Sequence, residues 1–112
     1  MMNEPKKLEA QKDDGDIKAD SGKLRYDLIP IDALEGIAEI LTYGAKKYND
    51  NNWLKSKYPN RYYAAMMRHI SEVRRGHFVD NESGLFHIDH ALVSLMMYRE
   101  LMIKNEVHPK EK

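Results

Sequence analysis

The chain has 112 residues, of which 42% are hydrophobic, so it is long enough for one domain with an apolar core. Its 18 Lys and Arg residues balance its 18 Asp and Glu residues, which argues against binding to nucleic acid or membrane through net charge. The absence of cysteine excludes disulfide scaffolds, cysteine-ligated metals and thiol catalysis. No apolar run approaches the roughly 20 residues of a membrane helix, and the N-terminus is too polar for a signal peptide, so we expect a cytoplasmic protein.

The first 30 residues divide into two parts. Residues 1–20 are dense in Lys, Glu and Asp, so we expect a charged, flexible tail ahead of a single helical domain over residues 21–112. Residues 21–30 (SGKLRYDLIP) alternate basic and apolar side chains up to the proline, which predicts an extended segment. Its basic residues, Lys23 and Arg25, are placed to point into a site.

Three helices are expected in the rest of the chain. Apolar residues recur at helical spacing in three stretches, which predict helices over residues 31–48, 61–75 and 85–104. Pro30 suits a helix start, and Asp32 with Glu35 resembles a capping box. Gly76 is a stop signal for the second helix, whereas Gly44 either ends the first helix early or lies within it.

Polar loops separate these helices, and no pair of strands is predicted. The sequence therefore predicts an all-α fold, a small helical bundle. Residues 91–98 of the third helix are apolar on nearly every side, which is typical of a helix at the centre of a fold or of an oligomer. We expect a homo-oligomer, a dimer or a tetramer, because this helix has more apolar surface than a three-helix monomer covers.

Two glutamates on the first helix are candidate metal ligands. Glu35 and Glu39 are four residues apart and share one helix face, which Lys46 continues. Like charges at this spacing repel each other, and a divalent cation between them reverses that penalty. Paired carboxylates suit Mg²⁺ or Mn²⁺, and the alternative is an ordinary solvated helix face.

A second candidate group lies at the start of the third helix. His87 and His90 are three residues apart, so both rings lie on one side of the first turn, with Asp89 between them. Such groups bind metals, polarise a water molecule or contact phosphate. The alternative is a pair of histidines that bond to the backbone or pack at a helix start.

The second helix and the loop before it supply basic and aromatic residues. Arg61, Arg68 and Arg75 recur every seven residues, close to one face, and arginine suits bidentate contacts to phosphate. His69 lies on the edge of the apolar stripe. Trp53, the only tryptophan, either stacks on a nucleobase or caps a small core. The alternative for the arginines is a solvated basic face.

Five ordered strings together resemble a known family. They are DSGKLRYDLIP (residues 20–30), LEGIAEILTYGAKKY (34–48), NW (52–53), RYYAAMMRH (61–69) and ESGLFHIDHA (82–91). In these strings the chain resembles the phage dATP/dGTP diphosphohydrolase family, the MazZ-like proteins, which are related to the all-α MazG-type nucleotide pyrophosphatases. The resemblance implies hydrolysis of a purine nucleoside triphosphate to monophosphate and pyrophosphate with Mg²⁺ or Mn²⁺, and, for a phage protein, a place in the host cytoplasm.

MazG-type enzymes carry an E-E-x-x-E motif on one helix and an E-x-x-D motif on a later one. Glu35 and Glu39 match the outer glutamates of the first motif, and Gly36 stands at its middle position. The second motif has no direct match, and its positional candidates are the pair His69 and Glu72 or the pair His87 and His90. This interpretation assigns metal binding to Glu35, Glu39 and Asp89, catalysis to Glu35, Glu39, His87 and His90, and substrate binding to Lys23, Arg25, Lys46, Trp53, Arg61, Arg68 and His69.

Two other functions remain open on the sequence. A catalytically inactive nucleotide-binding sponge, which sequesters a host immune signalling nucleotide, needs the basic and aromatic residues but not the carboxylates, and Gly36 favours it. A structural helical oligomer or adaptor predicts no response to nucleotides. In the first two cases we expect a small-molecule nucleotide as the ligand, and neither nucleic acid nor a membrane as a partner.

Overall fold

The computed structural model describes residues 21–105, and this range is helical for most of its length. In chain order the elements are η2 (Tyr26–Leu28), α3 (Ile31–Lys47), η3 (Asn52–Lys55), α4 (Asn60–Arg74) and α5 (His87–Lys104), where η marks a 3-10 helix. Within residues 21–105, strand pairing is limited to an isolated antiparallel bridge between Val79 and Phe86. The all-α prediction is confirmed, whereas the predicted tail over residues 1–20 lies outside the described residues.

The first long helix, α3, begins at the predicted residue and ends one residue early, with Gly44 inside it. The predicted capping box is wrong. Pro30 is the N-cap residue and makes no side-chain cap bond, so Asp32 lies in the first turn rather than at the cap. A capping side chain has to stand at the N-cap itself to reach the free N–H groups, and Asp32 comes two positions too late.

The end of α4 follows the predicted stop signal. Gly76 has a φ of 87°, a left-handed conformation that favours glycine because it has no Cβ. The backbone N–H of His77 donates to the Glu72 carbonyl at 2.9 Å, and that of Gly76 donates to the Val73 carbonyl at 2.9 Å. This is the Schellman pattern, which satisfies the last carbonyls of the helix.

The start of α5 lies two residues after the predicted one, at His87. The two residues before it belong to a closed loop instead. The Leu85 carbonyl accepts from the Asp80 N–H at 2.8 Å, and the His87 N–H donates to the Phe78 carbonyl at 2.8 Å. Phe86 is therefore extended, with φ −69° and ψ 135°, and it serves as the N-cap residue. A pairing with residues earlier in the chain overrides the local helical pattern here.

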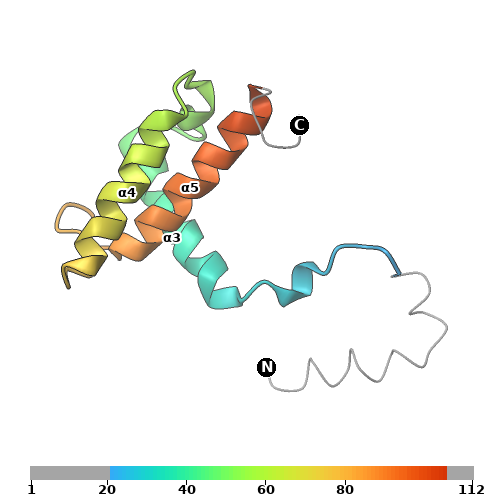
Figure 1. The fold of residues 1–112 in the computed structure, drawn as a ribbon, viewed down its shortest axis with the longest axis horizontal. Helices are drawn as coiled ribbons and strands as arrows, with labels where there is room; N and C mark the ends of the chain where they lie inside the picture. Colours follow the sequence, from blue (N-terminus) through green and yellow to red (C-terminus); the bar gives the residue numbers. More distant parts are fainter. Residues whose placement is uncertain (1–20, 106–112) are drawn as a thin grey trace.

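The helices pack around α5. It lies beside α4 and also contacts α3, while the N-terminal half of α3 and residues 21–30 extend away from the α4–α5 pair (Figure 1). Among residues 21–105 the buried apolar side chains are Ile40 of α3 and Ala91, Val93 and Leu101 of α5. The core therefore runs along α5, in agreement with the predicted central place of this helix.

Much apolar surface is left exposed in the single chain. Residues 21–30, here called the N-terminal arm, expose Leu24, Tyr26 and Leu28 by 67–76%. On α5, Leu92 and Leu95 are also exposed, although the same helix carries most of the core. These surfaces are consistent with the predicted oligomer, which stays a prediction. No helix of the described chain is long and apolar enough to cross a membrane.

Candidate functional site

A cleft of about 1240 Å³ opens between the three long helices and the connection from α3 to α4. Its aromatic lining residues are Tyr43, Tyr48, Trp53, Tyr58 and Tyr62, and its basic ones are Lys55, Lys57, Arg61, Arg68, His69 and His90. Ligand pockets in proteins have volumes of about 300–1,000 Å³, so this cleft has room for a nucleotide and water. Asp50 is the one carboxylate among the described residues that line it.

The connection from α3 to α4 is a folded wall of this cleft. Asn51 adopts a left-handed conformation, with a φ of 55°, which asparagine tolerates better than most residues. This turn starts η3 and places Trp53 in the cleft lining, partly covered. The Lys104 ammonium at the end of α5 donates to the Leu54 carbonyl at 2.5 Å, which ties η3 to the helix.

Five of the predicted site residues meet in the cleft. They are Trp53, Arg61, Arg68, His69 and His90. Trp53 comes from η3, the next three from α4, and His90 from α5. The cleft thus combines aromatic faces, which stack on nucleobases, with guanidinium groups, which bind phosphate.

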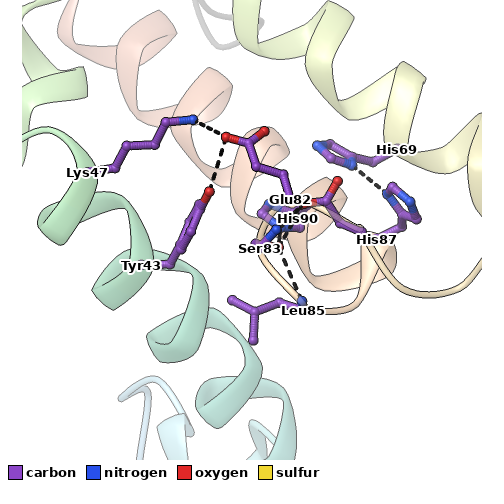
Figure 2. A network of polar contacts seen from close by, with 9 residues as sticks. Tyr43, Lys47, His69, Glu82, Ser83, Leu85, His87 and His90 are labelled. Atoms are coloured by element: carbon purple, nitrogen blue, oxygen red, sulfur yellow. Dashed lines mark hydrogen bonds and ion pairs between the residues drawn. The ribbon is translucent and has the colours of Figure 1, made fainter.

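Three histidines form a contact group at one end of the cleft (Figure 2). The Nδ1 atoms of His69 and His87 lie 2.9 Å apart, within hydrogen-bond distance. The rings of His69 and His90 stack, with centroids 4.6 Å apart and an interplanar angle of 11°. His87 is 8% exposed, whereas His69 and His90 line the cleft. His69 therefore stands between the cleft and a buried imidazole.

The loop before α5 fixes the orientation of His90. Ser83 Oγ lies 2.7 Å from His90 Nε2 and donates to Asp80 Oδ2 at 2.8 Å. It also accepts the backbone N–H of Leu85 at 3.1 Å. Because the serine has one proton and gives it to the carboxylate, the His90 Nε2 must be the donor to Ser83. Neutral His90 is thus protonated on Nε2, and its Nδ1 is unprotonated.

The surroundings of these histidines favour their neutral forms. Burial lowers the pKa of His69 below its ordinary 6.5, and positive charge on His90 or His87 lowers it further. Burial is also the main reason why the pKa of His90 is lowered, although the Asp80 carboxylate opposes the effect. At neutral pH both rings are therefore uncharged and able to accept a proton.

A second contact attaches the same loop to α3. The Lys47 ammonium donates to Glu82 Oε2 at 2.5 Å, and the Tyr43 hydroxyl donates to the same oxygen at 3.3 Å (Figure 2). The carboxylate raises the pKa of Lys47, and the lysine lowers that of Glu82. Tyr43 also meets the His90 ring edge to face, with centroids 6.2 Å apart. The loop is thereby connected to both α3 and the histidine group.

The predicted metal ligands occupy a different part of α3. Glu35 and Glu39 are exposed, and neither they nor Lys46 line the cleft. The Asp89 carboxylate packs against Gly36, where a Cβ would lie 2.6 Å from Asp89 Oδ1. Within residues 21–105 no group of three or more His, Asp or Glu side chains is placed to hold a metal ion together.

The remaining predicted residues also lie outside the cleft. Lys23 and Arg25 belong to the N-terminal arm, where Arg25 forms a bidentate ion pair with Asp27 at 2.8 Å. His87 lies behind His69, as described above. Within one chain the structure therefore brings the aromatic and basic residues together, but neither the arm nor the glutamate pair joins them.

Sequence reasoning did not identify Tyr62 and Ser83 as site residues, nor the hydrogen bonds through Ser83 that join Asp80 to His90. Tyr62 lines the cleft one residue after Arg61, and it carries no signal apart from its aromatic side chain. Asp80 and Ser83 lie three residues apart in the loop before α5, where Asp80 Oδ2 accepts the Ser83 backbone N–H at 2.9 Å. An Asp followed by Ser in a polar loop is a recognisable turn signal, but it does not reveal the contact with His90.

Comparisons with known proteins identify relatives of this chain. A family model described as dATP/dGTP diphosphohydrolase, N-terminal, matches residues 13–110. A dATP/dGTP diphosphohydrolase of Salmonella phage PMBT28 is 38% identical over 80 residues, which cover 71% of this chain and 27% of the relative. The chain thus spans about a quarter of the length of that curated relative. No solved structure matches it. Because the family model covers most of its length, the chain belongs to the dATP/dGTP diphosphohydrolase N-terminal family.

Proposed function

We propose that this chain binds a purine deoxynucleoside triphosphate in the cleft and hydrolyses it to monophosphate and pyrophosphate. The observation that carries the proposal is the convergence of Trp53, Arg61, Arg68 and His69 in one nucleotide-sized cleft, in a member of this family. The name of the phage relative supports the substrate class and the reaction. As a phage-type protein it would act in the host cytoplasm, where its substrates are.

The cleft offers separate surfaces for the two ends of a nucleotide. Trp53 and the neighbouring tyrosines present aromatic faces, and base stacking on such faces contributes about 1–3 kcal/mol per base. Arg61 and Arg68 lie on α4, about two helical turns apart, and would bind phosphate oxygens through their planar guanidinium groups. We therefore assign the base to the Trp53 side and the phosphates to the α4 side.

We further propose that Glu35 and Glu39 hold Mg²⁺ or Mn²⁺ together with the substrate. Mg²⁺ commonly uses one or two protein carboxylates and completes its shell with phosphate oxygens and water, so a pair of glutamates fits it without a third protein ligand. Asp89 brings a further carboxylate to α3 at Gly36. When bound, such a metal neutralises charge on the phosphoryl oxygens.

Glu35 and Glu39 do not line the cleft of their own chain, so a complete site would need these residues from a second copy. We propose that a second copy supplies its Glu35 and Glu39, and the basic residues of its N-terminal arm, to the cleft. The exposed apolar side chains of the arm and of α5 provide surface for this association. Mixing Glu39→Gln protein with Arg68→Ala protein then restores hydrolysis that neither variant has alone.

The test of the proposed function is a product analysis. The protein is incubated with a panel of nucleoside triphosphates, with Mg²⁺ and separately with Mn²⁺, and the supernatant is chromatographed after heat denaturation. We expect monophosphate and pyrophosphate from dATP or dGTP. Arg68→Ala should weaken nucleotide binding, whereas Arg74→Ala, on the same helix but outside the cleft, should not. Glu39→Gln should abolish turnover, with Glu100→Gln on α5 as the control.

One observation favours a second function, the nucleotide sponge. Within one chain the aromatic and basic residues converge while the glutamate pair lies elsewhere, and a protein that binds without hydrolysis needs only the aromatic and basic residues. Such a protein sequesters a host signalling nucleotide. Recovery of unchanged nucleotide after heat denaturation, with no pyrophosphate from any substrate, would support the sponge and contradict the hydrolase.

A further inference from the structure

We propose that His69 accepts the proton of the water that attacks the nucleotide, and that His87 is the positioning residue that orients it. The inference rests on the proposed hydrolysis and gives His69, which the sequence predicted as a substrate-binding residue, a catalytic role. It depends on the contacts of the three histidines, their place at the end of the cleft, and the tautomers that those contacts allow.

The contact between His69 and His87 determines which nitrogen of His69 is available. Two Nδ1 atoms 2.9 Å apart form a hydrogen bond only if one carries a proton and the other does not. In an imidazole the Nε2 atom lies on the other side of the ring from Nδ1. His69 therefore engages the buried His87 with Nδ1 and keeps Nε2 for a molecule in the cleft that it lines.

We assign the shared proton to His69, so that its Nδ1 donates to His87 Nδ1. A neutral imidazole carries one proton, and His69 Nε2 is then an unprotonated acceptor. This assignment parallels the histidine of hydrolytic triads, in which the far nitrogen is held by an acceptor and the near nitrogen takes the proton. His87, fixed by burial, holds the ring in this orientation.

His90 restricts the ring of His69 in the remaining direction. The two rings are nearly parallel, and the Ser83–Asp80 pair holds the Nε2 edge of His90. The hydrogen bond to His87 thus holds the edge of the His69 ring, and the stacked His90 ring covers one of its faces. A base held in this way needs little reorganisation when a water molecule is presented to it.

Burial is the main reason why His69 stays unprotonated before the reaction, and the charges around it act in both directions. Arg68 on α4, and a proton on either His87 or His90 of α5, disfavour a positive charge on the ring, whereas Asp80 in the loop favours it. Burial and the repelling charges together outweigh the effect of Asp80, so the pKa of His69 is lowered. After proton transfer, the imidazolium donates to His87 Nδ1, and Asp80 lies among its neighbours.

The step is balanced in atoms and charge. The water oxygen forms a bond to the α phosphorus while one water proton moves to His69 Nε2. The bond between the α phosphorus and the oxygen bridging to the β phosphorus breaks, and pyrophosphate leaves with that electron pair. Nucleoside monophosphate remains in the cleft, and His69 returns its proton to solvent or to the leaving group before the next turnover.

His69→Gln is the variant that tests this step, since its amide keeps a polar group near the Nε2 position but cannot take the proton. We expect kcat to fall by about 10²- to 10⁴-fold, the usual contribution of a general base. The affinity for a non-hydrolysable α,β-methylene triphosphate should stay within about threefold of wild type. His77→Gln is the matched control, because His77 is an exposed histidine outside the cleft.

Two further readouts separate chemistry from folding. The wild-type kcat/KM should decrease as the pH falls through the lowered pKa of His69, below 6.5, and this acid limb should be absent in His69→Gln. Added imidazole should restore at least part of the rate of His69→Ala, because the free base fills the vacated space. Nitrogen NMR of the unliganded protein should show His69 protonated on Nδ1 and unprotonated on Nε2.

His87 has its own pair of variants. Asparagine places a polar atom near the Nδ1 position, so His87→Asn should keep most of the activity and the acid limb. His87→Phe removes the partner and should lower kcat by about tenfold with little change in KM. Equal losses in both variants would contradict a positioning role for His87.

The outcomes distinguish this inference from the proposed function. If wild type releases pyrophosphate and His69→Gln does so within about threefold of the same rate, His69 is not the base and the hydrolase assignment stands. If wild type binds nucleotide and leaves it intact, the hydrolase assignment and the role of His69 both fail. NMR showing His69 protonated on Nε2 would overturn the proposed proton assignment whichever nucleotide is bound.

Discussion

The two ends of the described chain differ in how they use apolar side chains. Along α5, Val93 and Leu101 are 1% and 0% exposed, since α3 and α4 pack around them. In the N-terminal arm, which extends away from the α4–α5 pair (Figure 1), the exposed fractions of Leu24, Tyr26 and Leu28 are 67–76%. Apolar residues of α5 thus stabilise the fold of the single chain. Similar residues of the N-terminal arm stay exposed and are available for contact with another molecule.

The same contrast holds for the ionisable groups. At the α4–α5 end, three histidines, a serine and an aspartate contact one another through hydrogen bonds and ring stacking. On the N-terminal half of α3, Glu35 and Glu39 face solvent. Contacts within the single chain are therefore enough to position the histidines. The proposed metal site at Glu35 and Glu39 would form only with the substrate and a second copy of the chain.

The largest expected effect separates the two apolar regions. Leu101→Ala should lower the free energy of unfolding by about 2–5 kcal/mol, because it removes a fully buried side chain and leaves a cavity. Leu28→Ala in the arm should change it by less than about 0.5 kcal/mol in dilute protein. Urea unfolding followed by circular dichroism measures both. Similar losses in the two variants would show that the arm packs on the same chain.

The next effect concerns the contact between α3 and α5. A Cβ at Gly36 would lie 2.6 Å from Asp89 Oδ1, so Gly36→Ala overpacks this contact at a cost of about 1–3 kcal/mol. The higher helix propensity of alanine recovers about 1 kcal/mol, which leaves a net loss of up to about 2 kcal/mol. Gly44→Ala is the control in the same helix, and it should stabilise, because nothing lies within 4 Å of its Cβ.

A double variant identifies the source of the Gly36 effect. In an Asp89→Ala background the clash is gone, so Gly36→Ala should become neutral or stabilising there. The comparison uses the same urea unfolding assay. A loss that persists in the double variant would mean that another neighbour, and not the Asp89 carboxylate, requires glycine at this position.

A smaller effect is the pH dependence of stability at the histidine end. The pKa values of His69 and His90 are lowered in the folded chain, so the unfolded chain binds more protons once the pH falls below about 6.5. The stability that their neutral packing provides is complete above this pH and is lost as the pH decreases. Melting temperatures at pH 7.5 and 5.5 should differ more for wild type than for His69→Gln. An equal difference would place the acid sensitivity elsewhere.

The helices were predictable because their signals are local. Periodic apolar residues locate α3 and α4 within one residue, and Gly76 marks the end of α4 correctly. The start of α5 was not predictable in this way, since the Val79–Phe86 bridge and the Asp80–Leu85 hydrogen bond join residues on either side of a loop. The spacing of apolar residues along a helix gives no information about such contacts across a loop.

The site was predictable in its residue types and not in its contacts. Sequence reasoning selected Trp53, Arg68 and His69 separately, and the structure brings them to one cleft. The Nδ1 contact between His69 and His87 joins two helices, so neither helix reveals it alone. From the sequence, Gly36 is a motif position that has lost its carboxylate. The structure places the Asp89 carboxylate of α5 against the backbone at this same position, which no pattern within α3 predicts.

The smallest expected effect comes from the contact that attaches the loop before α5 to α3. Glu82→Gln removes the charge that faces Lys47 but retains an amide oxygen to accept the Tyr43 hydroxyl, so it isolates the ion pair. The side chains of Lys47 and Glu82 are 40% and 65% exposed, and water screens such pairs strongly. We expect a melting temperature slightly below that of wild type at low salt, and a difference that vanishes at high salt. Glu82→Ala also loses the tyrosine bond, so part of its loss should persist at high salt. If the Glu82→Gln loss were independent of salt, the amide would be disturbing the loop and the histidines behind it, and the two regions compared above would be coupled through this residue.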